Sequence, residues 1–279
     1  MNIDFARTLC RLNNSFYRTQ AESFSETRHS AWEGWQRCCN HMSSRLQSSL
    51  APLHLLDVAC GNLRFESFLA KHLLESHASS ITVRALDACD GLVANNMGIL
   101  AQQYGSSLAI EYQHCDIIDS LAASPCDAEL LRLMAPQDES LPSALFDLEV
   151  TFGFMHHIPL PAWRNQLLSN MIATTVTNGI ICVSFWRFMD NPNLAAKAQK
   201  THRQGCAQLG FDPHDFNQND FLIGWNNAPG VYRYCHSFND ADIDQVIAFV
   251  QPQGATVIDR FRADGRTHNL NEYLVLQKN

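Results

Sequence analysis

The stretch Leu55-Leu56-Asp57-Val58-Ala59-Cys60-Gly61-Asn62-Leu63-Arg64-Phe65 decides the fold. Its apolar first half predicts a buried strand, and the small residues that follow predict a tight turn into a helix that Asn62 can cap. In open α/β sheets ligands bind where strands end, and the small residues of this turn let a ligand approach the backbone closely. A dinucleotide site has the glycines of G-x-G-x-x-G, so the lone Gly61 argues against a bound pyrophosphate. An ordinary strand-turn-helix is the alternative.

Two acidic residues follow the next two predicted strands in the same way. Asp87 ends Val83-Arg84-Ala85-Leu86-Asp87, and Asp116 follows His114-Cys115. A carboxylate at the first position can accept hydrogen bonds from both hydroxyls of a ribose. A carboxylate at the second can accept from an adenine amino group, with Ile117 covering the ring. Each alone is equally consistent with a turn or a helix cap, but their order at successive strand ends indicates a nucleoside.

Strand-like and helical stretches alternate after residue 50. The predicted strands are Leu53–Val58, Ile81–Asp87, Leu108–Cys115, Phe146–Phe152, Gly179–Phe185, Ala255–Phe261 and Glu272–Leu276, and the predicted helices are 64–76, 91–104, 160–176 and 239–250. This alternation predicts a doubly wound, mostly parallel seven-stranded α/β sheet with helices on both faces. Residues 1–50 predict a helical segment ahead of a domain over 51–279. That domain has insertions at 119–145, with a short helix at Asp127–Met134, and at 188–236, which we expect to form a cap.

Composition restricts the class of protein. Hydrophobic residues make up 46% of the 279 and charged residues 17%, so a sizeable core can form. No apolar run reaches the ~18 residues of a membrane span, and the first twenty residues lack an apolar signal core, so we expect a cytoplasmic protein. The ten cysteines contain no C-x-x-C pair, which predicts reduced, buried thiols and no metal site. A net charge of −8 does not suit DNA or another nucleic acid as partner.

Two segments resemble motifs of the Rossmann-like methyltransferases that depend on S-adenosylmethionine (SAM). Asp57-Val58-Ala59-Cys60-Gly61 is similar to their first motif, D-x-G-x-G. Phe146-Asp147-Leu148 and Met155-His156-His157-Ile158-Pro159 are similar to their fourth-strand segment, with its L-H-H-hydrophobic run. The resemblance covers about residues 15–279 and implies SAM as cofactor and S-adenosylhomocysteine as product. Ala59 and Leu63 stand where the family has glycines.

Three further segments resemble the tRNA wobble-uridine carboxymethyl methyltransferases and their bacterial relatives. Phe16-Tyr17, followed by Phe24-Ser25-Glu26-Thr27-Arg28 and Trp32, is similar to the entry segment of that subfamily. Tyr232-Arg233-Tyr234-Cys235-His236 is similar to its R-Y-Y-H, and Asn271-Glu272-Tyr273-Leu274-Val275-Leu276 to its closing N-W-Y-V-V strand. The N-terminal helical segment is therefore expected to cover the cofactor site.

Pattern and resemblance together give a set of candidate site residues. The candidates for binding the cofactor are Tyr17, Arg28, Asp57, Ala59, Cys60, Gly61, Asp87, Ala88, Asp116, Ile117, Phe152 and Gly153. The candidates for catalysis are His156, His157, Arg233 and His236, and those for contact with the substrate are Trp32, Trp186, Arg187, Trp225 and Tyr232. Arg28 and Arg233 can each clamp a carboxylate, and we expect one to hold the methionine carboxylate of SAM and the other an acidic substrate. A carboxylate acceptor is ionised at neutral pH and needs no base, whereas a hydroxyl or amine favours a histidine base.

Three functions fit this sequence. We expect methyl transfer to an oxygen, including that of a carboxylate, or to a nitrogen of a small molecule. Modification of tRNA is the alternative, and it requires a basic rim around the site. A non-catalytic SAM-fold binding protein is the third, because two loop glycines are missing. We expect no membrane or DNA partner, and the sequence shows no docking surface for an activating protein.

Overall fold

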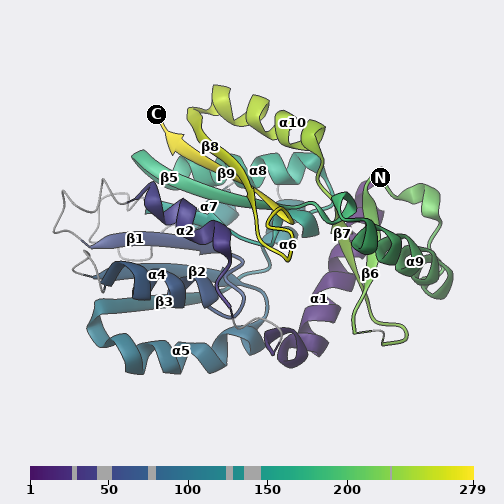
Figure 1. Ribbon diagram of the computed structural model, residues 1–279, viewed down its shortest axis with the longest axis horizontal. Coiled ribbons are helices and arrows are strands. Elements are labelled where there is room, and N and C mark those ends of the chain that lie inside the picture. The colour runs from purple at the N-terminus through teal and green to yellow at the C-terminus, as the bar shows by residue number, and fades with distance from the viewer. Residues whose placement is uncertain (27–29, 43–51, 75–79, 124–127, 135–145, 227) are drawn as a thin grey trace.

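The computed structural model describes residues 1–279 except 27–29, 43–51, 75–79, 124–127, 135–145 and 227 (Figure 1). Seven strands form one sheet in the order β3-β2-β1-β4-β5-β9-β8. They are β1 (Leu53–Val58), β2 (Ile81–Asp87), β3 (Leu108–His114), β4 (Phe146–Thr151), β5 (Thr175–Trp186), β8 (Ala255–Ala263) and β9 (Asn271–Lys278). Strands β1 to β5 run parallel, and β9 is antiparallel to β5 and β8. The strand order reverses between β1 and β4, where open α/β sheets bind ligands.

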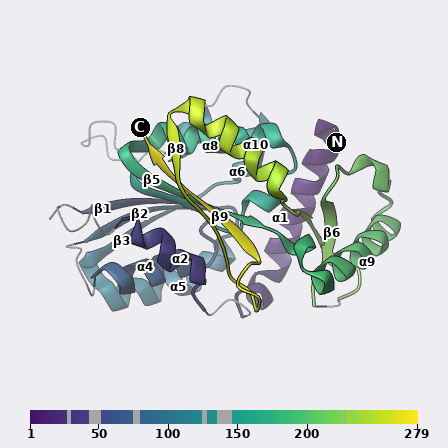
Figure 2. The ribbon, with the colours of Figure 1, turned by 45° about the horizontal axis from the view of Figure 1, so that its top comes forward.

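Helices cover both faces of the sheet (Figures 1 and 2). One face carries α2 (Glu33–Asn40), α4 (Arg64–Leu74) and α5 (Asp90–Tyr104), and the other carries α6 (Ile117–Ala123), α7 (Ala128–Met134), α8 (Pro161–Thr174) and α10 (Asp240–Val250). The single 3-10 turns within the described residues are η1 (Gly105–Ser107), η2 (Met155–His157), η3 (Phe188–Asp190), η4 (Pro213–Asp215) and η5 (Gln251–Gln253). No helix within the described ranges combines the length and the apolar character that crossing a membrane requires.

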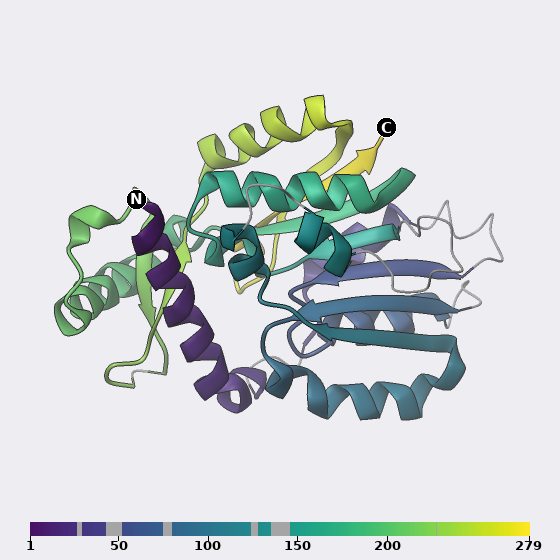
Figure 3. The ribbon, with the colours of Figure 1, turned by 180° about the vertical axis from the view of Figure 1, so that it is seen from behind.

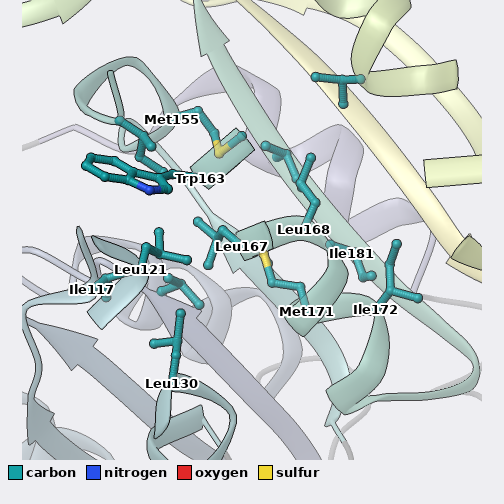
Figure 4. Packing of buried hydrophobic residues seen from close by; sticks show 14 of the residues in the cluster. Ile117, Leu121, Leu130, Met155, Trp163, Leu167, Leu168, Met171, Ile172 and Ile181 are labelled. Carbon is teal, nitrogen blue, oxygen red and sulfur yellow. The ribbon is translucent and has the colours of Figure 1, made fainter. Parts of the chain in front are cut away.

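Helix α8 shows how the sequence builds one half of the core (Figure 4). Trp163, Leu167 and Met171 recur every four residues, which places them on one side of the helix. All three are buried in the same cluster as Ile181 of β5 and Leu121 of α6. Burial of a large apolar side chain contributes about 1.5–3 kcal/mol, so these residues hold α8 firmly against the sheet and α6.

A separate lobe lies at the carboxyl ends of the parallel strands (Figures 1 and 3). It consists of α1 (Ile3–Ser25), α9 (Pro192–Leu209) and a two-stranded antiparallel sheet of β6 (Asp220–Gly224) and β7 (Tyr232–His236). Asn13 joins α1 to β7, because its Oδ1 accepts from the Tyr234 amide at 2.7 Å and its Nδ2 donates to the Tyr234 carbonyl at 3.1 Å. Helix α1 is thereby held over the ends of the strands.

The predicted α/β sheet and the N-terminal helices are confirmed, with differences at some boundaries. The helix predicted over 160–176 ends at Thr174, and β5 begins at Thr175 rather than Gly179, since the β-branched run Thr175–Thr177 favours a strand. The helix predicted at Asp127–Met134 is α7, although Asp127 lies outside the described residues. The sequence does not predict β6 and β7 inside the 188–236 insertion.

Candidate active site

A cavity of about 800 Å³ opens at the carboxyl edge of the sheet. Its walls come from the loops that follow β1, β2, β3 and β4, from α1, and from Arg233 of β7. The predicted residues that line it are Tyr17, Trp32, Asp57, Ala59, Cys60, Gly61, Asp87, Ala88, Asp116, Ile117, Phe152, Gly153, His156, His157, Trp186 and Arg233. Segments far apart in the sequence therefore meet at the reversal of strand order.

The loop between β1 and α4 has the left-handed backbone that glycine favours, although only one of its three left-handed residues is a glycine. Ala59, Gly61 and Leu63 have φ values of 67°, 56° and 56°, in the left-handed region that costs a residue with a Cβ about 1–2 kcal/mol. Ala59 and Leu63 are the positions where the resemblance implies glycines. Two residues with a Cβ thus adopt left-handed conformations here, and backbone strain of this kind clusters in ligand-binding loops.

Asp87 stands beside this loop with its carboxylate fixed by backbone amides. Its two oxygens accept hydrogen bonds from the amides of Gly61 at 2.9 Å and of Cys89 at 2.8 Å. Burial raises the pKa of Asp87, and these amides act in the opposite direction. Each carboxylate oxygen has a second lone pair, so both hydroxyls of a ribose can still bind here.

Asp116 lies after the end of β3, directly before the N-terminus of α6. One of its oxygens accepts from the amide of Asp119, and the other accepts from the side chain of Asn14 on α1. Ile117 is buried and lines the cavity next to it. An acceptor beside an apolar wall suits the amino edge and the face of an adenine ring.

A chain of hydrogen bonds joins His157, Tyr17 and Arg233 on the other side of the cavity. The Tyr17 hydroxyl lies 2.7 Å from His157 Nε2 and accepts from Arg233 Nη1 at 3.1 Å. Because arginine can only donate, the Tyr17 oxygen is the acceptor of that bond. His157 Nδ1 lies 3.1 Å from the Tyr234 carbonyl and 3.1 Å from Asn13 Nδ2. Burial, reinforced by the Arg233 charge, lowers the pKa of His157 to about 3 and keeps the ring neutral.

Arg233 itself is a buried cation enclosed by aromatic rings. Its side chain lies 5.2 Å from the ring centre of Phe16, 5.6 Å from Phe24, 5.4 Å from Trp225 and 5.9 Å from Trp186. Only 5% of the residue is exposed, and its Nε has no hydrogen-bond partner. No carboxylate of the described chain forms an ion pair with it. An arginine of this kind is suited to bind an anion that enters the cavity.

His156, His157 and Cys235 form the one cluster among the described residues whose geometry suits a metal ion. Their ligand atoms lie within 4.8 Å of one another and all three are buried. Both nitrogens of His157 already face Tyr17 and the Tyr234 carbonyl. Burial also raises the pKa of the Cys235 thiol to about 12, although Arg233 opposes this. We therefore interpret the cluster as packing at the rim of the cavity.

Four predicted residues do not line the cavity. His236 is buried between Asp220 and Asp242, with nitrogen-to-oxygen distances of 2.7 and 3.4 Å. The other three form hydrogen bonds elsewhere. Arg187 donates to Asp190, Asp240 and Glu272. Tyr232 donates to Gln208, and Trp225 donates to Ser23. Their side chains are engaged in structural contacts, and Trp225 contacts the cavity residues Phe24 and Arg233 without lining the cavity itself.

Arg28 lies outside the described residues. Several cavity residues were not predicted as such, among them Asn13, Asn14, Arg18, Ala21, Phe24, Trp35, Asp264 and Asn271. On α1 the spacing from 13 and 14 through 17, 18 and 21 to 24 marks one face of a helix. That periodicity could have identified the face of α1 that lines the cavity, but it could not show which other elements form the cavity. Asp264 is held at the cavity by contact with a segment distant in the sequence, because its carboxylate accepts hydrogen bonds from the Gly34 amide and the Tyr273 hydroxyl.

No family model matches this sequence, and no curated protein is similar to it in sequence. Solved structures are similar in fold. The 1,6-didemethyltoxoflavin-N1-methyltransferase of Burkholderia thailandensis is 14% identical, with a TM-score of 0.55 and a match that covers 99% of this chain and 89% of that chain. Magnesium protoporphyrin IX methyltransferase of Synechocystis PCC 6803 is 11% identical, with a TM-score of 0.54 and coverage of 95% and 99%. A SAM-dependent methyltransferase of Methanosarcina mazei is 12% identical, with a TM-score of 0.53 and coverage of 81% and 92%.

These likenesses show that the chain has the fold of SAM-dependent methyltransferases. This confirms the fold that the sequence motifs predicted. The resemblance to enzymes of the tRNA wobble uridine stays a prediction.

Proposed function

We propose that the protein is a SAM-dependent methyltransferase whose acceptor is a small anionic molecule. The fold supports the reaction class, and two of the similar structures contain bound S-adenosylhomocysteine. The cavity supports the cofactor, because a carboxylate for the ribose, an acceptor for adenine and a tight loop follow three successive strands. The three features accommodate a nucleoside that lacks a pyrophosphate.

The residues of the cavity fit SAM better than a dinucleotide. Asp87 would hold the ribose, and Asp116 with Ile117 would hold the adenine. Ala59 and Leu63 occupy positions where a pyrophosphate needs glycines, and the loop is closed by the Cys60 amide donating to the Leu86 carbonyl at 3.0 Å. When bound, SAM supplies a methyl group on a positively charged sulfur. The protein's task is to place the acceptor atom ~3–3.5 Å from that carbon and to exclude water.

Arg233 is the observation that carries the choice of acceptor. A guanidinium buried without a carboxylate partner is unfavourable unless a ligand supplies the negative charge. Tyr17 would contribute its oxygen to the same end of the cavity. His157 is neutral but a weak base, since burial lowers its pKa to about 3. This argues for an acceptor that needs no deprotonation, such as a carboxylate oxygen.

Transfer of radiolabelled methyl from SAM to fractions of a cell extract tests this function. The proposal predicts label in acidic small molecules and little or none in bulk tRNA. The matched variant Arg233→Gln should lose that label while it still binds SAM. Label in tRNA alone would support the tRNA reaction instead, and absence of SAM binding would contradict both.

A further inference from the structure

The four aromatic rings around Arg233 divide into two pairs. Trp186, at the end of β5, and Phe24, near the end of α1, line the cavity and are half-buried. Phe16 and Trp225 enclose the same guanidinium but do not line the cavity. Because Trp186 and Phe24 lie 5.9 and 5.6 Å from the guanidinium, a ligand that binds Arg233 from the cavity is expected to contact both rings.

Both of these rings are held in place by their neighbours. The centre of the Trp186 ring lies 5.1 Å from that of His156 and 4.6 Å from that of Phe188. The Phe24 ring packs edge-on against Tyr17, with 5.1 Å between the ring centres. Side chains that are already ordered lose little freedom when a ligand binds. The two rings thus form a preorganised surface beside the buried cation.

This surface lies at a different part of the sheet edge from the expected ribose contact. Asp87 ends β2 and Trp186 ends β5, and three strand spacings separate these strands in the order β2-β1-β4-β5. Neighbouring strands lie ~4.8 Å apart, so the two strand ends are separated by roughly 14 Å. The rings therefore belong to the part of the cavity that remains for the acceptor when a nucleoside binds at Asp87 and Asp116.

The chemistry of this surface favours one kind of anion. The faces of aromatic rings carry partial negative charge and their edges partial positive charge. A small inorganic anion or a short aliphatic acid gains nothing from the ring faces, and a cationic ligand is repelled by Arg233. An aromatic acid, by contrast, can pair its carboxylate with the guanidinium and pack its own ring against Trp186 and Phe24.

We propose that the acceptor is an aromatic carboxylic acid whose carboxylate pairs with Arg233 and whose ring packs against Trp186 and Phe24. This inference rests on the proposed function, and it narrows the acceptor from any small anion to one chemical class. Arg233 supplies the affinity for the charge, and the two rings determine which acids are accepted.

Binding of matched acids to the protein loaded with S-adenosylhomocysteine tests this class of acceptor. Benzoate and 2-naphthoate are compared with cyclohexanecarboxylate and decahydro-2-naphthoate, which have the same charge and carbon skeleton but no aromatic ring. Calorimetric titration should give dissociation constants about 2- to 10-fold lower for each aromatic acid than for its saturated counterpart, which is the effect of one aromatic contact.

Two tryptophan variants locate the contact. Trp186→Leu should lower the preference for the aromatic acid by about twofold or more. Trp225→Leu is the matched control, because Trp225 lies 5.4 Å from the Arg233 guanidinium but does not line the cavity, and it should keep the wild-type preference. A change in Arg233 itself affects both acids of a pair alike, so the ratio of their dissociation constants reports the ring contact.

The outcomes separate this inference from the proposed function. Absence of S-adenosylhomocysteine binding to the wild type, or of binding by every acid, would contradict the proposed function and the inference together. Equal or tighter binding of the saturated acids would overturn the aromatic class alone, and this comparison on the wild type depends on no variant. An unchanged preference in Trp186→Leu would likewise overturn the placement of the ring.

Discussion

Replacing Arg233 with methionine should stabilise the protein and abolish its use of the acceptor. The guanidinium is 95% buried without a carboxylate partner in the described chain. Isolation of an ion from water costs several kcal/mol. The hydrogen bond to Tyr17 offsets about 1 kcal/mol of this, and the four surrounding rings offset about 2 kcal/mol together. We expect a net gain of about 1–3 kcal/mol in the free energy of unfolding.

Thermal unfolding and steady-state kinetics measure the two effects. For 279 residues the entropy of unfolding is ~0.6 kcal/mol/K, so Tm should rise by about 2–5 °C. Loss of a bidentate, charge-assisted contact should lower kcat/KM for the acceptor by about 100-fold or more. Affinity for SAM should change by less than about threefold, because the expected ribose and adenine contacts come from Asp87 and Asp116.

Arg187→Met is the matched control, because Arg187 is equally buried but has partners. It pairs with Asp190, Asp240 and the buried Glu272. Its removal should therefore destabilise the protein by about 2–4 kcal/mol. If Arg233→Met lowers Tm as Arg187→Met does, Arg233 serves the fold and the argument for an anionic acceptor is refuted.

Three more substitutions test local features of the structure. Ala59→Gly should raise the free energy of unfolding by up to about 1 kcal/mol in urea denaturation, because glycine adopts a φ of 67° without strain; lower stability would contradict strain in the loop. Gly34→Ala should lower it by about 2 kcal/mol or more in the same assay, since the new Cβ would lie 2.3 Å from the ring of the fully buried Tyr273; unchanged stability would mean that the ring can move. Burial raises the pKa of Glu149 to about 8, so the folded protein keeps a proton that the unfolded chain releases, and wild-type stability falls as pH rises from about 5 to 8. In Glu149→Gln that fall should be smaller when urea unfolding is measured at both pH values, and an identical pH dependence would remove Glu149 as its source.

The sequence predicts the sheet well because its strands are continuous apolar runs between turn signals. Strands β1 and β2 match their predicted bounds from Leu53 to Val58 and from Ile81 to Asp87. Both are buried between helices, so hydrophobicity alone marks them. Strand β7 lacks such a mark, because the polar Arg233 and His236 are buried for reasons that depend on α1 and β6.

The candidate site likewise contains residues that the sequence could place and properties that only the structure reveals. Residues that follow strands, such as Asp87 and Asp116, could be placed by their position in the alternating pattern. Arg233 was assigned from a resemblance, but its isolation from carboxylates is a three-dimensional fact that no spacing reveals.

Equilibrium binding of SAM to the wild type and to Asp87→Ala tests the central claim most directly. Asp87 holds the position expected to accept from the ribose, and the exposed Asp119, which does not line the cavity, supplies the control Asp119→Ala. We predict that SAM binds the wild type and Asp119→Ala alike, and that Asp87→Ala weakens binding by about 1–3 kcal/mol, or roughly 5- to 150-fold. Absence of binding to the wild type, or equal binding by Asp87→Ala, would contradict this account of the cavity.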